Sequence, residues 1–500
     1  MDTFLTGALG ALQPINLLYC TLGCVVGTLI GVLPGIGPVA TISLLLPLVI
    51  GLDPLSSIIM IAGIYYGAAY GGSITSILVN IPGEASTVVT CIDGYQMAKQ
   101  GRGGVALAIA AGGSFVAGTL GTFAIALLAE PLMGVALRFG PPEYFALMVL
   151  GIVLVSFMSR GTFAKALTMV MLGLLLSLVG QDVITGEVRF TLDIFELTDG
   201  VGLVPLAMGL FGISEVLSNI ERIKSDPLVI ERITSLTPSA QDLREAAGPV
   251  ARGSVLGFML GLLPGGGPTL ASFASYFLEH RLSKRPETFG RGALAGVAGP
   301  EAANNAAASG SFIPLFVLGL PSNAAMALLL GAFTMYGLSP GPQLLADPSG
   351  LFWGVIVSMY VGNVILLVLN LPLIGIWVRL LRAPYAILFP FILLFMLIGS
   401  YAMAKNPFDV YLLVGFGVIG YLLKKADYEL APLILAYVLG NQMETAFRQT
   451  LMIGRGSFDF LLSRPITLGI LGFTLLVLVA SMASRVRRSR AALITQLEED

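Results

Sequence analysis

The chain has 500 residues, of which 56% are hydrophobic and only 11% are charged, and its formal net charge is −2. A soluble domain carries about 25% charged residues, so this composition excludes a soluble globular protein and indicates a polytopic membrane protein. Apolar runs long enough to span a bilayer recur from Asn16 to Ser481. Residues 1–12 lack the basic region that begins a signal peptide, so we expect no cleaved leader.

The chain holds three cysteines and one histidine, His280. Cys20 and Cys24 lie four residues apart, on one face of a predicted helix, and Cys91 lies beside a polar turn. A metal site needs more ligands than these. We therefore expect the cysteines to be small buried apolar residues, and we expect no metal site.

In chain order, the first unusual element is GVLPGIGP at 31–38, where prolines and glycines interrupt an apolar segment. AAYGGSITSILVNIPGEAS follows at 68–86, with polar side chains and a proline turn inside a span. A long apolar span covers 104–128, and VPLAMGLFGISEVLSNI covers 204–220. A charged linker comes next, at 223–252.

The same landmarks return in the same order in the second half of the chain. GLLPGGGP occupies 261–268, AAASGSFIPLFVLGLPSNAA occupies 306–325, a long apolar span covers 350–371, and APLILAYVLGNQMETAF covers 431–447. Ordered self-similarity of this kind indicates an internal duplication. The predicted divisions are a first repeat at 1–222, a charged cytoplasmic linker at 223–252, a second repeat at 253–455, and an extra span with a basic tail at 456–500.

The placement of lysine and arginine orients the repeats, because cytoplasmic loops are enriched in these residues. The linker, the loop at 279–291 and RVRRSR at 485–490 are basic, so all three are predicted to be cytoplasmic. The counterpart of 279–291 in the first repeat, at 51–54, has no basic residue, whereas 99–103 is basic and its counterpart at 337–350 is not. The repeats are therefore predicted to have inverted topology, which is typical of transporters.

The segment 253–278 begins and ends beside arginines that are both predicted to be cytoplasmic, so it cannot cross the membrane once. We expect a re-entrant helical hairpin that turns at 263–268, and an equivalent hairpin from the opposite face that turns at 33–38. Irregular backbone at membrane depth is tolerated only inside protein or against a watery cavity. The N–H groups that begin a returning helix attract anions, and the carbonyl groups that end an outgoing helix suit Na⁺. The two tips are therefore predicted to form half-sites that meet near the midplane.

Two further breaks, at 72–84 and 309–323, bring polar side chains to membrane depth, where such groups normally face a cavity or a partner. The predicted substrate-binding residues come from these four breaks and the polar run beside them, and are Pro34, Gly35, Gly37, Pro38, Ser73, Asn80, Gly83, Pro264, Gly265, Gly266, Gly267, Pro268, Asn304, Asn305, Ser311, Ser322 and Asn323. The candidates for a coupling-ion site are Thr75, Glu84 and Glu301. No nucleophile–base pair is evident in the sequence, so no catalytic residue is predicted.

Other patterns have simpler interpretations. Gly112, inside an apolar span, is expected to serve close helix packing. GIGPVA at 35–40 fits a dinucleotide-binding fingerprint, but no βαβ unit surrounds it, so the match is discounted. Tyr65 fits either a cavity wall or an interfacial belt. Glu215 and Glu444 fit either helix-end or subunit contacts or a coupling role, and the sequence leaves both open.

GVLPGIGP, YGGSITSILVNIPGEAST, GLLPGGGPTLASFASY and GPEAANNAAASGSFIPLFVLGLPSN resemble the large permease subunit of the tripartite tricarboxylate transporters. The resemblance extends from Leu12 to about Arg464. It implies a bacterial inner-membrane secondary transporter, driven by a Na⁺ or H⁺ gradient, that imports citrate and other carboxylates. It also implies two partners, a small four-helix membrane protein and a periplasmic solute-binding protein that largely selects the solute.

The sequence is therefore interpreted as a multi-pass permease subunit that holds a carboxylate between opposed hairpin tips and moves it by an elevator-like motion. The N-terminus is expected in the periplasm and the C-terminus in the cytoplasm. Few cations lie at membrane depth, so the substrate's charge must be met by helix N-termini, serine and asparagine donors and a bound cation. The alternatives are a gated anion channel, a stand-alone carboxylate/cation symporter, and a membrane enzyme built on Glu84 and Glu301. Apart from Na⁺ or H⁺ as the coupling ion, no cofactor is expected, and no nucleic-acid partner is expected.

Overall fold

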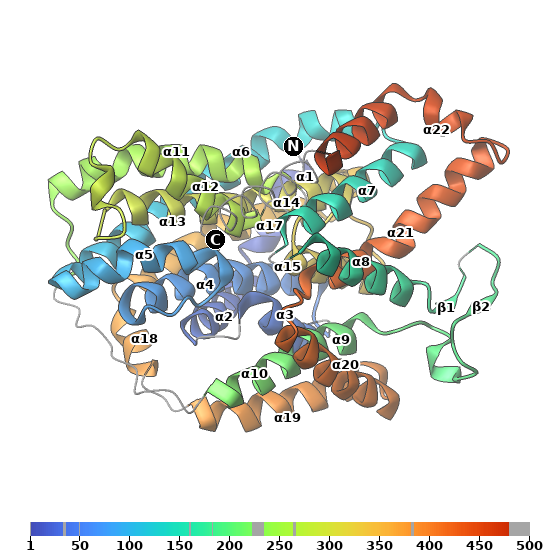
Figure 1. Cartoon of the computed structure of the whole chain (residues 1–500), viewed down its shortest axis with the longest axis horizontal. Helices are drawn as coiled ribbons and strands as arrows, with labels where there is room; N and C mark the ends of the chain where they lie inside the picture. Colours follow the sequence, from blue (N-terminus) through green and yellow to red (C-terminus); the bar gives the residue numbers. More distant parts are fainter. Residues whose placement is uncertain are drawn as a thin grey trace, which may run out of the picture.

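The computed structural model describes residues 2–33, 37–49, 51–159, 162–182, 184–222, 235–263, 267–381 and 385–479. This part of the chain is mostly helical, and a short antiparallel pair of strands lies between α8 and α9 (Figure 1). Up to residue 222 the elements are α1 Asp2–Ala11, α2 Pro14–Val32, α3 Gly37–Val49, α4 Pro54–Val79, η1 Ala85–Thr87, α5 Val88–Met97, η2 Ala98–Arg102, α6 Gly103–Ala136, α7 Pro141–Met158, α8 Phe163–Ser177, β1 Gly180–Gln181, β2 Val188–Arg189, η3 Phe195–Leu197, α9 Leu203–Ala207, η4 Met208–Ile213 and α10 Ser214–Arg222.

The second half of the chain continues the helical pattern (Figure 1). Its elements are α11 Ala240–Gly261, α12 Gly267–Leu282, η5 Pro286–Thr288, α13 Ala295–Gly310, α14 Phe312–Leu318, α15 Ala324–Met335, α16 Pro342–Ala346, α17 Leu351–Asn370, α18 Ile374–Leu380, α19 Tyr385–Ala404, α20 Pro407–Lys425, α21 Ala431–Ile453 and α22 Asp459–Ser463. In β1 and β2, Gly180 pairs with Arg189 and Gln181 with Val188.

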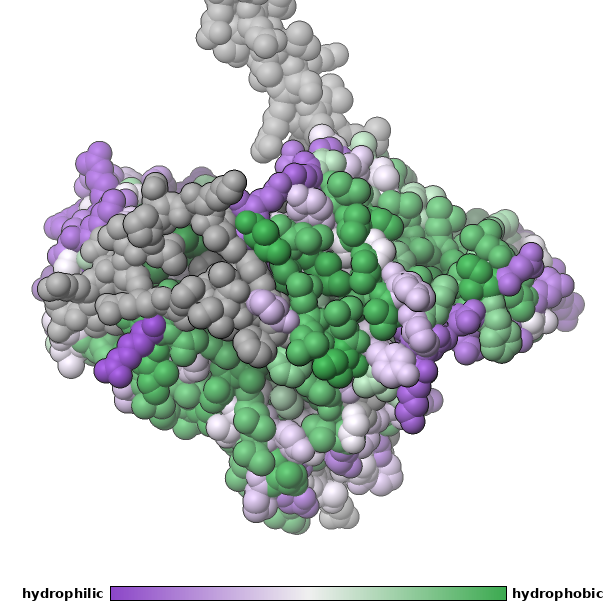
Figure 2. Space-filling model, turned by 90° about the horizontal axis from the view of Figure 1, so that it is seen from below, coloured by the Kyte–Doolittle hydropathy of each residue, from purple (hydrophilic) through white to green (hydrophobic). Residues whose placement is uncertain are grey.

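Six helical segments of the described chain are long and apolar enough to cross a membrane, by length and composition. They are Pro14–Val32, Pro54–Val79, Ala85–Ala136, Leu203–Glu221, Leu351–Asn370 and Pro407–Lys425. Large hydrophobic side chains are exposed along α19 and α20, and Figure 2 shows wide hydrophobic areas on the face seen from below. The predicted class, an all-α polytopic membrane protein, is confirmed.

Glycines four residues apart bring α2 and α4 into backbone contact. The series are Gly23, Gly27 and Gly31 in α2, and Gly63, Gly67 and Gly71 in α4. A Cβ atom added at Gly27 would lie 2.4 Å from the carbonyl oxygen of Ile64, which is closer than any side chain tolerates. Small residues at such positions let membrane helices approach closely and gain van der Waals contact. We call this contact the first glycine seam.

A second glycine seam joins α11 to α13. Gly253, Gly257 and Gly261 of α11 face Gly299, Ala303 and Ala307 of α13. A Cβ atom at Gly257 would lie 2.2 Å from the carbonyl oxygen of Ala303. In both seams the contacts advance in the same direction along the two helices, so each pair of helices runs parallel. The outgoing helix of each predicted hairpin is thus fixed in the same way.

The two halves of the chain also pack across each other in matched pairs. α6 packs on α13 and α17 packs on α4, while α8 packs on α21 and α20 packs on η4. When each helix is replaced by its counterpart in the other predicted repeat, the contact of α6 with α13 becomes that of α17 with α4. In the same way, the contact of α8 with α21 becomes that of α20 with η4. This exchange and the two glycine seams support the predicted duplication, and the repeat boundaries themselves stay a prediction.

The outgoing helix of the second predicted hairpin begins earlier in the chain than the sequence predicts. α11 starts at Ala240, inside the segment assigned to the linker. Ser239 Oγ accepts a hydrogen bond from the Asp242 N–H at 3.1 Å, and the Asp242 carboxylate accepts one from the Ser239 N–H at 2.9 Å. This capping box starts a helix despite the high local charge.

Two other segments refine the predicted boundaries. α4 is continuous to Val79, so the first helix break is confined to the turn at 80–84. Residues Pro465–Val479 are helical, in the region predicted as the extra C-terminal span. The basic tail at 485–490 lies outside the described residues.

We predict that Gly257→Ala lowers the free energy of unfolding by about 1–3 kcal/mol, because the added methyl group overpacks the second glycine seam. Gly112→Ala is the matched control, since no atom lies within 4 Å of a Cβ there. Gly112→Ala is expected to raise the free energy of unfolding by about 0.5–1 kcal/mol, because alanine loses less backbone entropy on folding than glycine does. Thermal unfolding in detergent measures both variants, and equal melting temperatures would contradict the seam's role.

Candidate functional site

A cavity of about 790 Å³ lies where the two predicted hairpins meet α7, α10 and α21. Its near wall is formed by the first turns of α3, α12 and α15 and by the turns that follow α4 and α14. Its far wall is formed by residues of α7, η4, α10 and α21. The volume lies within the range of small-molecule binding sites, about 300–1,000 Å³.

The two returning hairpin helices begin at the cavity in the same way. α3 starts at Gly37 and α12 at Gly267, and both glycines adopt left-handed backbone, with φ of 65° and 49°. Other residues rarely adopt this conformation. Pro38 and Pro268 follow, and a proline at this position has no N–H to leave without a partner. The remaining N–H groups of each first turn, and the positive end of each helix dipole, lie at the cavity wall.

Two turns of matching shape complete the near wall. Asn80 follows α4 and Gly319 follows α14, and both are left-handed, with φ of 59° and 68°. Glu84 and Asn323 then take the same extended conformation, with φ of −144° and −155°, and stand at the N-caps of η1 and α15. The two turns therefore place a carboxylate and an amide at equivalent positions.

Each of these two capping residues contacts a helix from the other half of the chain. Asn304 on α13 donates from Nδ2 to Glu84 Oε1 at 3.5 Å. Asn323 donates from Nδ2 to the Tyr65 hydroxyl on α4 at 3.1 Å, and to Ser311 Oγ at 3.5 Å. Tyr65 also lines the cavity, which answers the question that the sequence left open for this residue. The two half-sites are therefore linked by crossed hydrogen bonds.

A second polar cluster lies behind the near wall. Glu301 on α13 is 1% exposed and accepts hydrogen bonds from Ser73 Oγ at 2.6 Å and from Thr90 Oγ1. Beside it, Asn305 Nδ2 donates to Ser114 Oγ at 2.7 Å. In the described part of the chain, no lysine or arginine forms an ion pair with Glu301. The carboxylate is thus buried among hydroxyl groups.

The predicted site residues fall into three groups. Those in the cavity wall are Gly37, Pro38, Gly83, Glu84, Gly267, Pro268, Ser322 and Asn323. Those outside the wall are Ser73, Thr75, Glu301, Asn304, Asn305 and Ser311, which are buried, and Asn80, which is exposed. Those outside the described residues are Pro34, Gly35, Pro264, Gly265 and Gly266. The structure therefore describes both hairpin tips only at their edges.

Sequence reasoning missed the far wall of the cavity. Val155 on α7, Phe211 on η4 and Leu435 on α21 all line it. They are apolar residues in apolar helices, so no motif distinguishes them. The repeat between 204–220 and 431–447 contains Phe211 and Leu435, and this duplication is the signal in the sequence that points to the far wall.

Glu215 and Glu444, whose roles the sequence left open, both form ion pairs. Glu215 lines the cavity, and its Oε2 lies 2.5 Å from Lys424 Nζ on α20. Glu444 Oε1 lies 2.7 Å from Arg189 Nη1 and 3.0 Å from Arg448 Nη2. The pair of Glu215 ties the first turn of α10 to α20, and the pair of Glu444 with Arg189 ties the middle of α21 to β2. Both glutamates therefore make structural contacts, and for Glu215 the contact is at a helix end.

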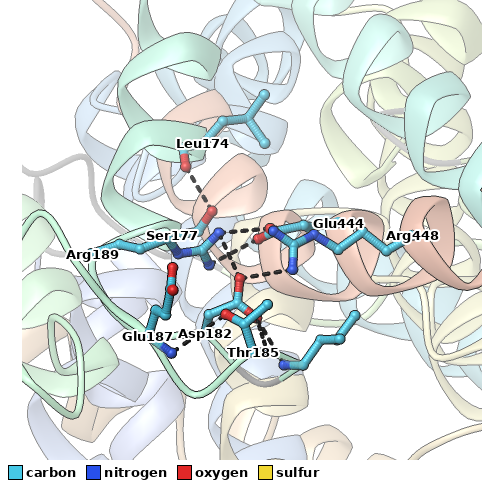
Figure 3. Close-up of polar contacts among 9 residues, drawn as sticks. Leu174, Ser177, Asp182, Thr185, Glu187, Arg189, Glu444 and Arg448 are labelled. Carbon is cyan, nitrogen blue, oxygen red and sulfur yellow. Dashed lines mark hydrogen bonds and ion pairs between the residues drawn. The ribbon is translucent and has the colours of Figure 1, made fainter.

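Asp182, Arg189, Glu444 and Arg448 form a cluster of four charges that joins the β1–β2 turn to α21 (Figure 3). Asp182 Oδ2 lies 2.7 Å from Arg448 Nη1 and 3.1 Å from Arg189 Nη1. Its other oxygen accepts a hydrogen bond from the Thr185 N–H at 2.9 Å. The backbone hydrogen bonds, that from Thr185 first, and the two guanidinium groups lower the pKa of Asp182 to about 2. We call this group the Asp182 cluster.

Because the pKa of Asp182 is lowered from 3.8 to about 2, the cluster stabilises the loop above pH 3.8 and loses this contribution only as the pH falls through about 2. We predict that cleavage of the loop by a soluble protease in nanodiscs is the same at about pH 8 and about pH 5. Asp182→Asn is expected to raise cleavage several-fold at both values. The exposed Asp193→Asn is the control, and equal cleavage of the two variants would show that the cluster does not fix the loop.

The fold and the cavity define a class of protein: an all-α polytopic membrane protein in which helix N-termini form the wall of an internal site. The chain matches the model of the Tripartite tricarboxylate transporter TctA family over residues 17–435, and it belongs to this family. The resemblance found in its motifs is therefore confirmed, and the chain is a membrane subunit of a tripartite tricarboxylate transporter. Membership in a transporter family favours transport over catalysis.

Two relatives from Agrobacterium vitis are each 49% identical to this chain. One is described as an uncharacterized 52.8 kDa protein in the TAR-I ttuC' 3' region; it aligns over 503 residues and 100% of both chains. The other is described as an uncharacterized protein in the TAR-II ttuC' 3' region; it aligns over 234 residues, 47% of this chain and 97% of its own length. No solved structure matches this chain.

Proposed function

We propose that this chain is the permease subunit of a cation-coupled secondary transporter that imports carboxylates delivered by a solute-binding protein. It functions in a bacterial inner membrane, with its N-terminus in the periplasm and its C-terminus in the cytoplasm. Its partners are a small four-helix membrane subunit and the periplasmic solute-binding protein. Membership in the tripartite family supports the assembly, and the basic linker and tail support the orientation.

The convergence of helix N-termini on one cavity is the observation on which this proposal depends. α3, α12 and α15 each contribute their first turn to the wall. Free N–H groups and the positive ends of helix dipoles bind carboxylates, with each dipole contributing about 0.3–2 kcal/mol. The described lining residues include no lysine and no arginine. Recognition of the anion therefore depends on backbone N–H groups and on a donor such as the Ser322 hydroxyl.

Carboxylates in the same wall favour the co-transport of a cation. Glu215 is paired with Lys424, and Glu429 accepts a hydrogen bond from Ser159 Oγ at 2.8 Å. Glu84 accepts a short hydrogen bond from Ser86 Oγ and a weak one from Asn304 Nδ2 at 3.5 Å, and within the described residues it forms no ion pair. An anionic substrate beside Glu84 is repelled unless a cation lies between them. This electrostatic requirement supports coupling to Na⁺ or H⁺.

We assign the coupling ion to the region of Thr75, Glu84 and Glu301. An isolated buried carboxylate is costly, so Glu301 is expected to be protonated or to have a bound cation. A Cβ atom at Gly83 would lie 3.0 Å from Thr75 Oγ1 and 2.3 Å from the carbonyl oxygen of Gly31, near the end of α2. The negative end of the α2 dipole therefore faces this region, which favours a cation.

The position of the cavity supports an elevator-like motion. Its near wall belongs to α3, α12, α15 and the turns that follow α4 and α14, and its far wall belongs to α7, η4, α10 and α21. A substrate bound at the boundary between two rigid groups of helices is carried when one group slides against the other. We propose that the hairpins and the substrate move together against the far wall.

Asn323→Asp is predicted to reduce carboxylate uptake about 10-fold or more, because a second negative charge at the cavity wall repels the substrate. Asn323→Ser is the matched control. Both aspartate and serine retain the N-cap that Asn323 gives to the Met326 N–H at 3.0 Å, so both variants should insert and fold. Uptake of a radiolabelled carboxylate into proteoliposomes, with the solute-binding protein present, tests this. Equal uptake by the two variants would show that the anion does not bind there.

Glu301→Gln is predicted to abolish concentrative uptake while preserving exchange of labelled for unlabelled substrate. The amide keeps the shape of the side chain: its oxygen accepts from one of the Ser73 and Thr90 hydroxyls and its NH2 donates to the other. It carries no negative charge and takes up no proton, so it cannot balance the charge of a coupling cation. Uptake with and without imposed Na⁺ and H⁺ gradients measures the coupling. Accumulation by the wild type against the substrate gradient separates a transporter from a gated channel, and unimpaired accumulation by the variant would exclude Glu301 from coupling.

A further inference from the structure

The segment 181–200 between α8 and α9, of which the structure describes 181–182 and 184–200, lies apart from the cavity wall. We call it the acidic finger; it contains β2 and η3 and projects away from the helices (Figure 1). Leu192 is 83% exposed and Phe195 is 86% exposed. Six ionisable residues in this segment keep it out of the hydrocarbon region. Large apolar side chains exposed together outside lipid mark an interaction site.

Ion pairs and a backbone hydrogen bond hold the base of the acidic finger. The Asp182 cluster ties its base to α21 (Figure 3), and the Gln181 N–H donates to the Thr198 carbonyl oxygen at 2.9 Å. Phe190 and Leu192 both have φ of 54°, a left-handed conformation that is strained for bulky apolar residues. A loop held in a strained conformation by its surroundings points to function, and a preformed surface loses little entropy on binding.

The negative charge of the acidic finger limits the kinds of molecule that can bind to it. Its exposed carboxylates are Glu187, Asp193, Glu196 and Asp199. Among the residues that the structure describes, none of the four forms an ion pair, and Arg189 is already neutralised within the Asp182 cluster. An anionic lipid surface would repel these charges, and so would the same finger of a second copy. The remaining occupant is a protein with basic residues.

We propose that the acidic finger is the docking surface for a soluble protein that presents an apolar recess bordered by lysine or arginine. Leu192 and Phe195 enter the recess, where fully desolvated side chains contribute most of the binding energy. The four carboxylates meet the basic border, which speeds association and sets the orientation. The Asp182 cluster connects this surface to α21, whose first turns line the cavity.

The identity of the partner rests on the proposed function. In the topology that the lysine and arginine residues predict, the acidic finger lies on the face opposite the linker at 223–252, in the periplasm. The partner expected there is the solute-binding protein of the same system. Docking at the acidic finger places this protein next to the helix that forms part of the far wall.

The test measures binding of the purified solute-binding protein, with its solute, to nanodiscs that hold the full chain and the small membrane subunit. The double variant Leu192→Ser/Phe195→Ser is expected to weaken binding about 10-fold or more. Changing the four carboxylates to amides is expected to slow association and to reduce its salt dependence. Met452→Ser, at a residue that is 59% exposed at the end of α21, is the matched control and is expected to bind like the wild type. Thermal unfolding checks that each variant is folded.

Unchanged binding by the double variant, while wild-type uptake requires the solute-binding protein, overturns the docking surface and leaves the proposed function intact. Uptake that does not require the solute-binding protein overturns both. Two parallel measurements use the same double variant, namely binding to phosphatidylglycerol vesicles and self-association. A loss in either of these, with binding of the solute-binding protein unchanged, assigns the acidic finger to lipid or to a second copy and likewise overturns the proposal.

Discussion

Contact between helix backbones is the constraint on which the rest of this structure depends. In each glycine seam, a helix that leads to a hairpin tip lies directly against a helix that leads to a polar turn. The distance between tip and turn is therefore set by main chain, which does not change with side-chain rotamers. Packing of α6 on α13 and of α17 on α4 then brings the two seams together. The cavity follows from this geometry.

Recognition by main-chain dipoles gives such a site an advantage over recognition by arginine. An arginine at membrane depth must be desolvated whether or not substrate is bound, and the cost is several kcal/mol unless a partner ion compensates it. Helix N-termini have no net charge to bury, and the glycine–proline starts of α3 and α12 leave their N–H groups at the cavity wall. Such a wall offers hydrogen-bond donors to the proposed carboxylate without burying an unpaired positive charge.

The sequence predicted those parts of the site that place special demands on the backbone. Gly37 and Gly267 have left-handed backbone, which glycine adopts readily, and prolines recur where helices break. Both features can therefore be recognised from the residue types in the sequence. The far wall was not predictable, because apolar residues such as Phe211 look the same whether they face lipid, protein or a cavity. Arg189 pairs with Glu444, 255 residues away, and local patterns contain no information about such a partner. The start of α11 was readable from Ser239, but the charge of the surrounding segment suggested a linker.

Glu84 and Asn323, at equivalent positions in the two halves, give the electric field in the cavity a direction. The backbone around them is nearly the same in the two halves, yet one residue is a carboxylate and the other a neutral amide. The potential across the cavity is therefore polarised although the architecture is close to twofold symmetric. If the cavity binds the anion and the cation of the proposed function, this polarity favours the anion near the amide and the cation near the carboxylate, so the two ions would not compete for one position.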